Sequence, residues 1–147
     1  MNITPFTSKP ENKPDPVKVF IGSERGNERA EKVLHWSMIN SGTTPIEIHW
    51  MNEIYVDSAW DKWKKWRKDN ERNTGFGWKT NFSCFRWAIP ECCHFKGKAI
   101  YLDVDQIVFQ DIRKLWDLSV GQYAALAVTP KRTDVMLLDC EKFSGDW

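Results

Sequence analysis

Apolar residues fall into short runs separated by turn-forming residues, and this pattern predicts alternating strands and helices. The run from Val17 to Ile21 is rich in β-branched residues and is predicted to be a strand that ends at Gly22. From Glu28 to Asn40 the apolar residues recur at helical spacing, with Asn27 expected as the N-cap. The apolar positions of this helix are Ala30, Val33, Leu34, Met38 and Ile39.

A second strand is predicted from Pro45 to Met51, where apolar and polar residues alternate. Strand, helix and strand in this order predict a right-handed βαβ unit with parallel strands. His49 is a polar member of the alternation, so we expect a structural role for it rather than a catalytic one.

The second half of the chain continues the alternation. Ile100 to Leu102 forms a short apolar run that is typical of a strand buried on both faces. A helix from Asn81 to Ala88 is expected to be stopped by Pro90. Further predictions are a helix over Asp111–Leu118 and strands over Tyr123–Val128 and Asp134–Leu138.

The segment Asp57–Asn70 combines tryptophan with basic residues. Trp60, Trp63 and Trp66 lie three residues apart, so a helix would carry them on roughly one face, with its bases elsewhere. One interpretation is an amphipathic helix that packs this stripe on the core. The other is a basic, aromatic surface for a phosphate-bearing or sugar partner.

Composition narrows the class of protein. The chain has 147 residues, 41% of them hydrophobic, and a formal net charge of +1. It is long enough for one domain with a core, and its charge argues against nucleic acid as a partner. No apolar stretch reaches the roughly 20 residues of a membrane span. Residues 1–16 are expected to be a disordered lead-in, residues 17–147 the domain, and the four cysteines reduced thiols in the cytoplasm.

Two carboxylates follow the strand that ends at Leu102. In an extended chain, the side chains of Asp103 and Asp105 would point to the same side, because side chains repeat with period two. Like charges held so close repel unless a cation lies between them, and carboxylate oxygens suit Mg²⁺ or Mn²⁺. The pattern therefore favours a metal–phosphate site as much as it favours two solvated aspartates at a strand-to-loop transition.

Other candidate chemistry is less specific. Arg86 lies one step off the apolar face of its predicted helix, where it could reach an anion or pair with an acid on the surface. Cys92-Cys93-His94 lacks the second spaced Cys/His pair of a zinc site. The chain also has no phosphate-binding loop of the Walker type.

The segment Lys98–Leu118, KAIYLDVDQIVFQDIRKLWDL, resembles the core signature of GT-A nucleotide-sugar glycosyltransferases of the glycogenin and bacterial galactosyltransferase type. The resemblance extends to FSCFRWAIPE (Phe82–Glu91), to VFIGSERGNERAEKVLHWSM (Val19–Met38) and to TDVMLLDCEKF, which begins at Thr133. It implies a Rossmann-like α/β fold with a mostly parallel central sheet flanked by helices.

The resemblance also implies roles for particular residues. Asp103 and Asp105 would hold Mn²⁺, or Mg²⁺, against the diphosphate of a nucleotide-sugar donor, with Asp105 and Arg86 as the catalytic pair. The implied donor-binding residues are Ile21, Gly22, Ser23, Arg25, Arg86, Asp103 and Val104. The acceptor, whether sugar, glycan or protein, is not specified.

Two departures separate this chain from the resemblance. Ser23-Glu24-Arg25 stands where many relatives carry Asp or Tyr, and Thr133-Asp134-Val135 stands where they carry Asn-Ser-Gly. A later histidine that supplies a third metal ligand has no counterpart after His94, so we expect a fragment. The alternatives are a phosphotransferase of the haloacid-dehalogenase type, with Asp103 as nucleophile, and a non-catalytic nucleotide-sugar-binding module.

Overall fold

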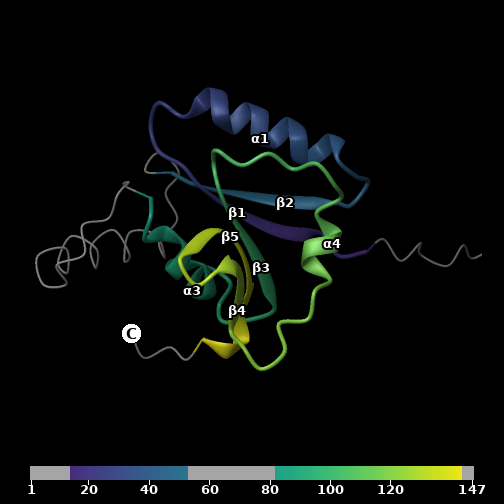
Figure 1. The fold of residues 1–147 in the computed structure, drawn as a ribbon, viewed down its shortest axis with the longest axis vertical. Coiled ribbons are helices and arrows are strands. Elements are labelled where there is room, and N and C mark those ends of the chain that lie inside the picture. The colour runs from purple at the N-terminus through teal and green to yellow at the C-terminus, as the bar shows by residue number, and fades with distance from the viewer. Residues whose placement is uncertain (1–13, 53–81, 144–147) are drawn as a thin grey trace, which may run out of the picture.

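A computed structural model describes residues 14–52 and 82–143 of the chain. Within these residues, five strands form one sheet in the order β2-β1-β3-β5-β4 (Figure 1). β1 is parallel to both β2 and β3, whereas β5 is antiparallel to β3 and to β4. The strands are β1 (Val17–Gly22), β2 (Ile46–Met51), β3 (Lys98–Asp103), β4 (Ala125–Thr129) and β5 (Arg132–Asp139). The predicted α/β fold with a central sheet flanked by helices is confirmed, and two of the four pairings between described strands are parallel and two antiparallel, so the described sheet is mixed.

β1, α1 (Glu28–Asn40) and β2 form the predicted βαβ unit, and the two strands are parallel as expected. The helix has the bounds that the apolar spacing indicates. Asn27 occupies the N-cap position as predicted, although its side chain makes no capping hydrogen bond.

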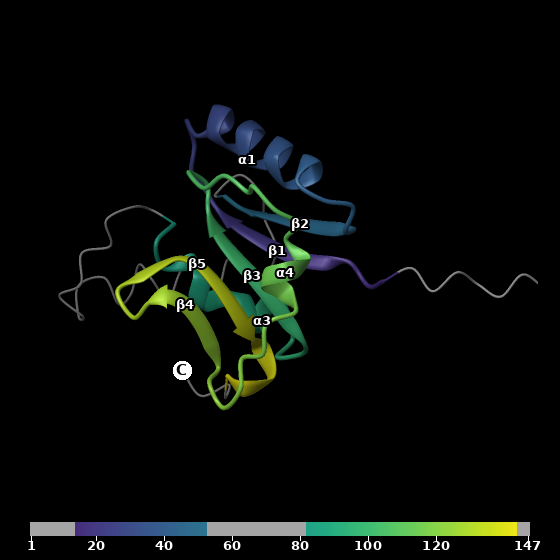
Figure 2. The same ribbon diagram turned by 45° about the vertical axis from the view of Figure 1, so that its right-hand side comes forward.

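α1 covers one face of the sheet (Figures 1 and 2). Only a narrow stripe of the helix meets the strands: Leu34 and Met38 are buried, whereas Val33 and Ile39 are 51% and 53% exposed. The apolar positions of the helix are therefore only partly covered by the sheet. Ser37 is buried in the stripe because its Oγ donates to the Leu34 carbonyl (2.8 Å) and accepts the Val108 amide (3.0 Å). The core on this face also contains Val17, Val19, Ile21, Ile100, Leu102, Val104, Ile112, Val120 and Leu137.

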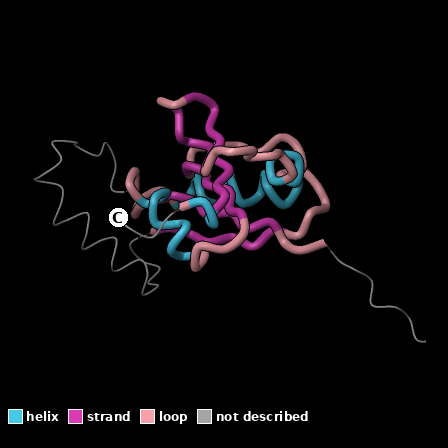
Figure 3. Tube along the Cα trace, turned by 90° about the horizontal axis from the view of Figure 1, so that it is seen from below, coloured by secondary structure: helices cyan, strands magenta, loops and turns pink. Residues whose placement is uncertain are grey.

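The opposite face packs against η1 (Phe85–Ala88) and α3 (Ile89–Cys92), so helical segments lie on either side of the strands (Figure 3). Pro90 does not stop a helix here, contrary to the prediction. It lies in the first turn of α3, where the missing amide would have no helical partner. The core on this face contains Phe20, Met51, Phe82, Cys84, Phe85, Ala88, Ile89, Cys93, Ala99, Tyr101, Met136, Leu138 and Cys140.

The second half of the chain follows the predicted order with shifted bounds. The helix predicted over Asp111–Leu118 is reduced to α4 (Arg113–Trp116), and η2 (Cys140–Lys142) follows β5. The Nζ of Lys98 donates to the Trp116 carbonyl, which places α4 beside the start of β3. None of the described helices is long and apolar enough to cross a membrane. The predicted Asp57–Asn70 helix lies outside the described residues.

Candidate functional site

The candidate site lies where β1 and β3 end side by side. Gly22, the last residue of β1, pairs with Asp103, the last residue of β3. The amide of Val104 then donates to the Gly22 carbonyl (3.1 Å), which holds the chain leaving β3 against the end of β1. Because both strands point the same way, this is the carboxyl edge of a parallel pair, where open α/β sheets bind ligands.

The two aspartates do not lie on one extended segment. β3 ends at Asp103, and the amide of Gln106 donates to the Asp103 carbonyl (3.2 Å) across a turn. The extended backbone on which the period-two expectation depends therefore ends at Asp103. Asp103 is half-buried, whereas Asp105 is exposed at the turn and accepts a hydrogen bond from the Gln106 side chain (3.0 Å).

Burial raises the pKa of the Asp103 carboxyl above its usual range. The charges of Asp105 and Asp134 also raise this pKa, because like charges disfavour ionisation. Opposing these effects, the Tyr101 hydroxyl and the Arg86 guanidinium lower the pKa. The register of β3 with β5 explains the influence of Asp134, because continuing the Leu102–Val135 pairing places it opposite Asp103.

Arg86, in η1, is the cation that faces Asp103. Its Nη2 lies 3.1 Å from Asp103 Oδ1, and the two side chains are 8% and 21% exposed. The same guanidinium donates from Nε to the Ser83 carbonyl (3.0 Å) and from Nη1 to the carbonyl and hydroxyl of Thr133. Four of its five N–H groups are thus taken by protein acceptors. Arg86 is a buried residue and not a surface arginine.

Tyr101 completes the surroundings of Asp103 from within β3 itself. Its ring is fully buried, and its hydroxyl donates to Asp103 Oδ1 (2.5 Å). The carbon at the centre of the Arg86 guanidinium lies 4.6 Å from the centroid of the ring. Burial is the main reason that the pKa of Tyr101 is raised far above its ordinary value, so the phenol stays protonated and remains a donor.

Gly22 gives the tyrosine hydroxyl its space. A β-carbon at this position would overlap Tyr101 Oη, and it would lie 2.9 Å from Phe82 Cδ2. Both obstacles are buried aromatic rings rather than flexible side-chain tips. The last residue of β1 is therefore a glycine because the hydroxyl of the neighbouring strand fills the place of a side chain.

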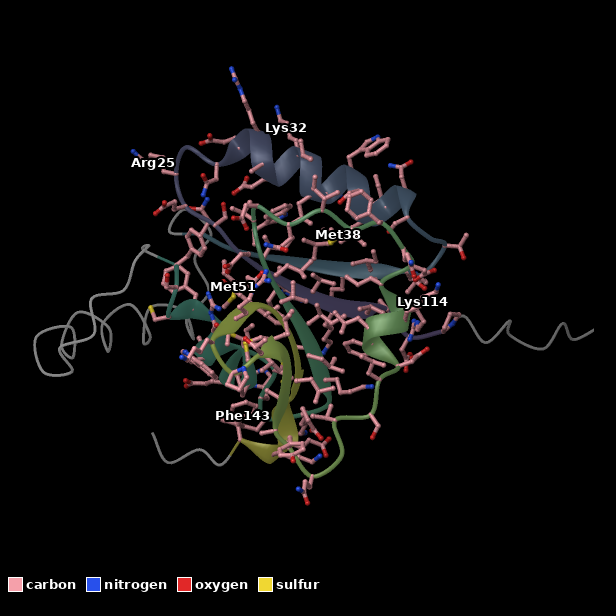
Figure 4. All side chains as sticks on the ribbon, viewed as in Figure 1. Arg25, Lys32, Met38, Met51, Lys114 and Phe143 are labelled. Atoms are coloured by element: carbon pink, nitrogen blue, oxygen red, sulfur yellow. The ribbon has the colours of Figure 1, made fainter. Side chains whose placement is uncertain are left out.

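The remaining predicted donor-binding residues differ in accessibility. Ile21 and Val104 are buried on the α1 side of the sheet, so a ligand at this edge would meet their backbone rather than their side chains. Ser23 is fully buried, and its hydroxyl donates to Glu31 Oε1 (2.6 Å), which also accepts from the Asn52 amide (3.3 Å). Arg25 is exposed in the loop between β1 and α1 and extends outward (Figure 4).

The donor set suits a hard divalent cation in part. The candidate ligand atoms are carboxylate oxygens, and the hydrogen bonds from described residues to the Asp103 carboxylate go to Oδ1 rather than Oδ2. Among the described residues, no group of three His, Cys, Asp or Glu side chains is placed to hold a metal ion. Two carboxylates alone would leave a cation to take its other ligands from a diphosphate and water.

Sequence reasoning missed three residues that shape this site. Tyr101 lies two residues before Asp103 and so shares its face of the strand, which period two could have indicated. Thr133 reaches Arg86 from β5, 47 positions away along the chain, and no local pattern signals that contact. Glu31 was one acidic residue among several on α1, with nothing to mark it as the partner of Ser23.

Comparison with known proteins places this chain in a family. The family model described as glycosyl transferase family 8 matches residues 31–144. Protein CDI of Arabidopsis thaliana is 29% identical over 125 residues, which cover 82% of this chain and 45% of that protein. The chain thus spans less than half the length of this curated relative.

Two solved structures share the fold. The apo form of the glycosyltransferase GlyE of Streptococcus pneumoniae TIGR4 has a TM-score of 0.61 and 20% identity, over 88% of this chain and 35% of that one. The galactosyltransferase LgtC, in complex with donor and acceptor sugar analogs, has a TM-score of 0.65 and 14% identity, over 86% and 59% of the two chains. At these identities the structures establish a GT-A-like fold and nothing finer.

Proposed function

The chain belongs to glycosyltransferase family 8, and from that premise we propose that it binds a nucleotide-diphosphate sugar and transfers the sugar to an acceptor. A UDP-sugar is the expected donor. The observation that carries the proposal is the position of Asp103, at the carboxyl edge of a parallel strand pair and beside Gly22, Arg86 and the exposed Asp105. The chain spans only part of the length of its relatives, so we propose that the activity belongs to it alone or to a longer protein of which it is the donor-binding part.

The leaving group of such a reaction is a nucleoside diphosphate, whose negative charge grows as the bond to the sugar breaks. Asp103 and Asp105 would hold Mn²⁺ or Mg²⁺, which supplies positive charge for the diphosphate when bound. Arg86 adds a second positive charge behind Asp103. Because its hydrogen bonds are mostly taken within the protein, Arg86 acts on the donor through its charge more than through new hydrogen bonds.

The edge of β1 suits the nucleotide half of the donor. The end of β1, from Ile21 to Gly22, lies beside the end of β3, and the hydrogen bond from Ser23 to Glu31 fixes the start of the loop toward α1. Arg25, exposed in that loop, would meet the nucleotide from outside. We therefore propose that Gly22 and its neighbours contact the nucleotide through main-chain atoms.

A non-catalytic nucleotide-sugar-binding module is the second candidate. The chain covers 45% of Protein CDI and 35% of GlyE, so it holds only part of what the longer proteins contain. The phosphotransferase alternative gains no support, because the family match is to glycosyl transferase family 8.

Two measurements separate the candidates. Titration calorimetry with UDP, in the presence and absence of Mn²⁺, should show metal-dependent binding. Incubation with UDP-glucose or UDP-galactose and Mn²⁺, followed by chromatography of released UDP, tests turnover. Binding together with UDP release supports the transferase, binding without release supports the module, and absence of metal-dependent binding contradicts both.

A further inference from the structure

Two hydrogen-bond donors from different elements converge on one oxygen of Asp103. The Tyr101 hydroxyl reaches Oδ1 along β3 (2.5 Å), and Nη2 of Arg86 reaches the same atom from η1 (3.1 Å). Building on the proposed function, we infer that Tyr101 is a positioning residue that, with Arg86, fixes Oδ1 and leaves Oδ2 as the oxygen that a cation binds. Tyr101 itself would touch neither the metal nor the donor.

Packing alone does not account for the hydroxyl of the buried Tyr101. The side chain packs among Phe82, Phe85 and Met136, in a cluster that phenylalanine would fill as well. Its hydroxyl lies in space that exists because residue 22 has no side chain. A buried hydroxyl needs a hydrogen-bond partner, and the partner that the structure provides is the Asp103 carboxylate.

The second donor is held rigidly as well. Ser83 and Thr133 bind three N–H groups of Arg86, so the guanidinium cannot swing away from Asp103 without breaking those bonds. Donors that approach one carboxylate oxygen from two fixed directions restrict rotation of the group. Groups that orient a metal ligand in this way typically change metal affinity about 10–100-fold when removed.

The test is Mn²⁺ binding to Tyr101→Phe, measured by the electron paramagnetic resonance signal of free Mn²⁺ in the presence of UDP. Tyr123→Phe is the matched control, because it removes the same hydroxyl from a side chain that is 61% exposed. Tyr123 also lies away from the site, because it precedes β4. The first residue of β4 pairs with Leu138, and Leu138 pairs with Ala99 at the opposite end of β3 from Asp103. We expect Mn²⁺ affinity to fall about tenfold or more in Tyr101→Phe and to stay unchanged in Tyr123→Phe.

The outcomes separate this inference from the proposed function. Equal Mn²⁺ affinity in wild type and Tyr101→Phe overturns the positioning role and leaves the proposed function standing. Absence of Mn²⁺ binding in the wild type overturns the proposed function itself. If Tyr101→Phe does not fold, a crystal structure of the wild type with Mn²⁺ and UDP decides: metal on Oδ2 with the hydroxyl still on Oδ1 supports the inference, and metal on Oδ1 overturns it.

Discussion

The close approach of Gly22 to Tyr101 predicts a specific coupling between two substitutions. In Gly22→Ala, the new methyl would overlap Tyr101 Oη and lie 2.9 Å from Phe82 Cδ2 and 3.0 Å from Tyr101 Cζ. Overpacking of a buried site typically costs about 1–3 kcal/mol, and we expect the upper part of this range because both neighbours are aromatic rings. If the tyrosine shifts to make room, its hydrogen bond to Asp103 is lost too.

Tyr101→Phe removes only that hydrogen bond. Hydrogen bonds to charged groups contribute about 1.5–3 kcal/mol, and the 21% exposure of the Asp103 side chain reduces this to about 1–2 kcal/mol. In the double variant the overlap with Oη disappears and the hydrogen bond cannot be lost twice. The combined loss should therefore be about 1–2 kcal/mol smaller than the sum of the two single losses.

Urea unfolding of the wild type, both single variants and the double variant, followed by tryptophan fluorescence, measures the coupling. A loss of about 3 kcal/mol would also lower Tm by roughly 6–12 °C in a domain of this size. Losses that add within about 0.5 kcal/mol would show that the methyl does not meet the hydroxyl. That result would refute the reasoning about why residue 22 is a glycine.

Other predictions concern charges around the fold. Arg86→Met leaves the half-buried Asp103 without its cation and should lower the free energy of unfolding by about 3 kcal/mol; Arg86→Lys should recover little, because one ammonium cannot reach Ser83, Thr133 and Asp103 together. Equal stability of wild type and Arg86→Met in urea would contradict this. Hydrogen bonds from Thr44, Arg113 and Thr43 lower the pKa of Asp111, so its contribution to stability is present above the unfolded-state pKa and is lost as the pH falls through the lower folded-state pKa. The free energy of unfolding in urea, measured from pH 5 to pH 2, should therefore fall less steeply in Asp111→Asn than in wild type. The same dependence on pH in both proteins would disprove the assignment. Chelation of divalent metal with EDTA should abolish the UDP-dependent rise in Tm, and a rise that persists would show nucleotide binding without metal.

Sequence patterns predicted the elements whose bounds and pairing depend on neighbouring residues. The bounds of α1 follow from apolar spacing, and the parallel pairing of β1 with β2 follows from the helix that connects them. Pro90 shows the limit, because a proline can end one helix or begin the next, and only the packing of η1 and α3 decides between them. The exposure of Val33 and Ile39 likewise depends on how narrow a stripe of α1 the sheet covers.

The candidate site was predictable in composition and not in geometry. Asp103, Asp105 and Arg86 could be named from the chain, and the structure brings Arg86 to Asp103. The turn at Asp105 could not be predicted from alternation. The orientation of Arg86 depends on hydrogen bonds to Thr133, which is distant in sequence. The disordered lead-in, the domain bounds and the cytoplasmic location stay predictions.

The most direct measurement of the central claim is the shift in Tm caused by UDP with Mn²⁺ in wild type, Asp105→Asn and Asp117→Asn. Asp117 is also exposed, but it directly follows α4. The hydrogen bond from Lys98 to the Trp116 carbonyl places the end of α4 beside the start of β3, at the opposite end of the strand from the site. A metal–diphosphate site at the end of β3 predicts a shift in wild type and Asp117→Asn and its loss in Asp105→Asn. An equal shift in all three proteins would contradict the assignment of the metal to these aspartates.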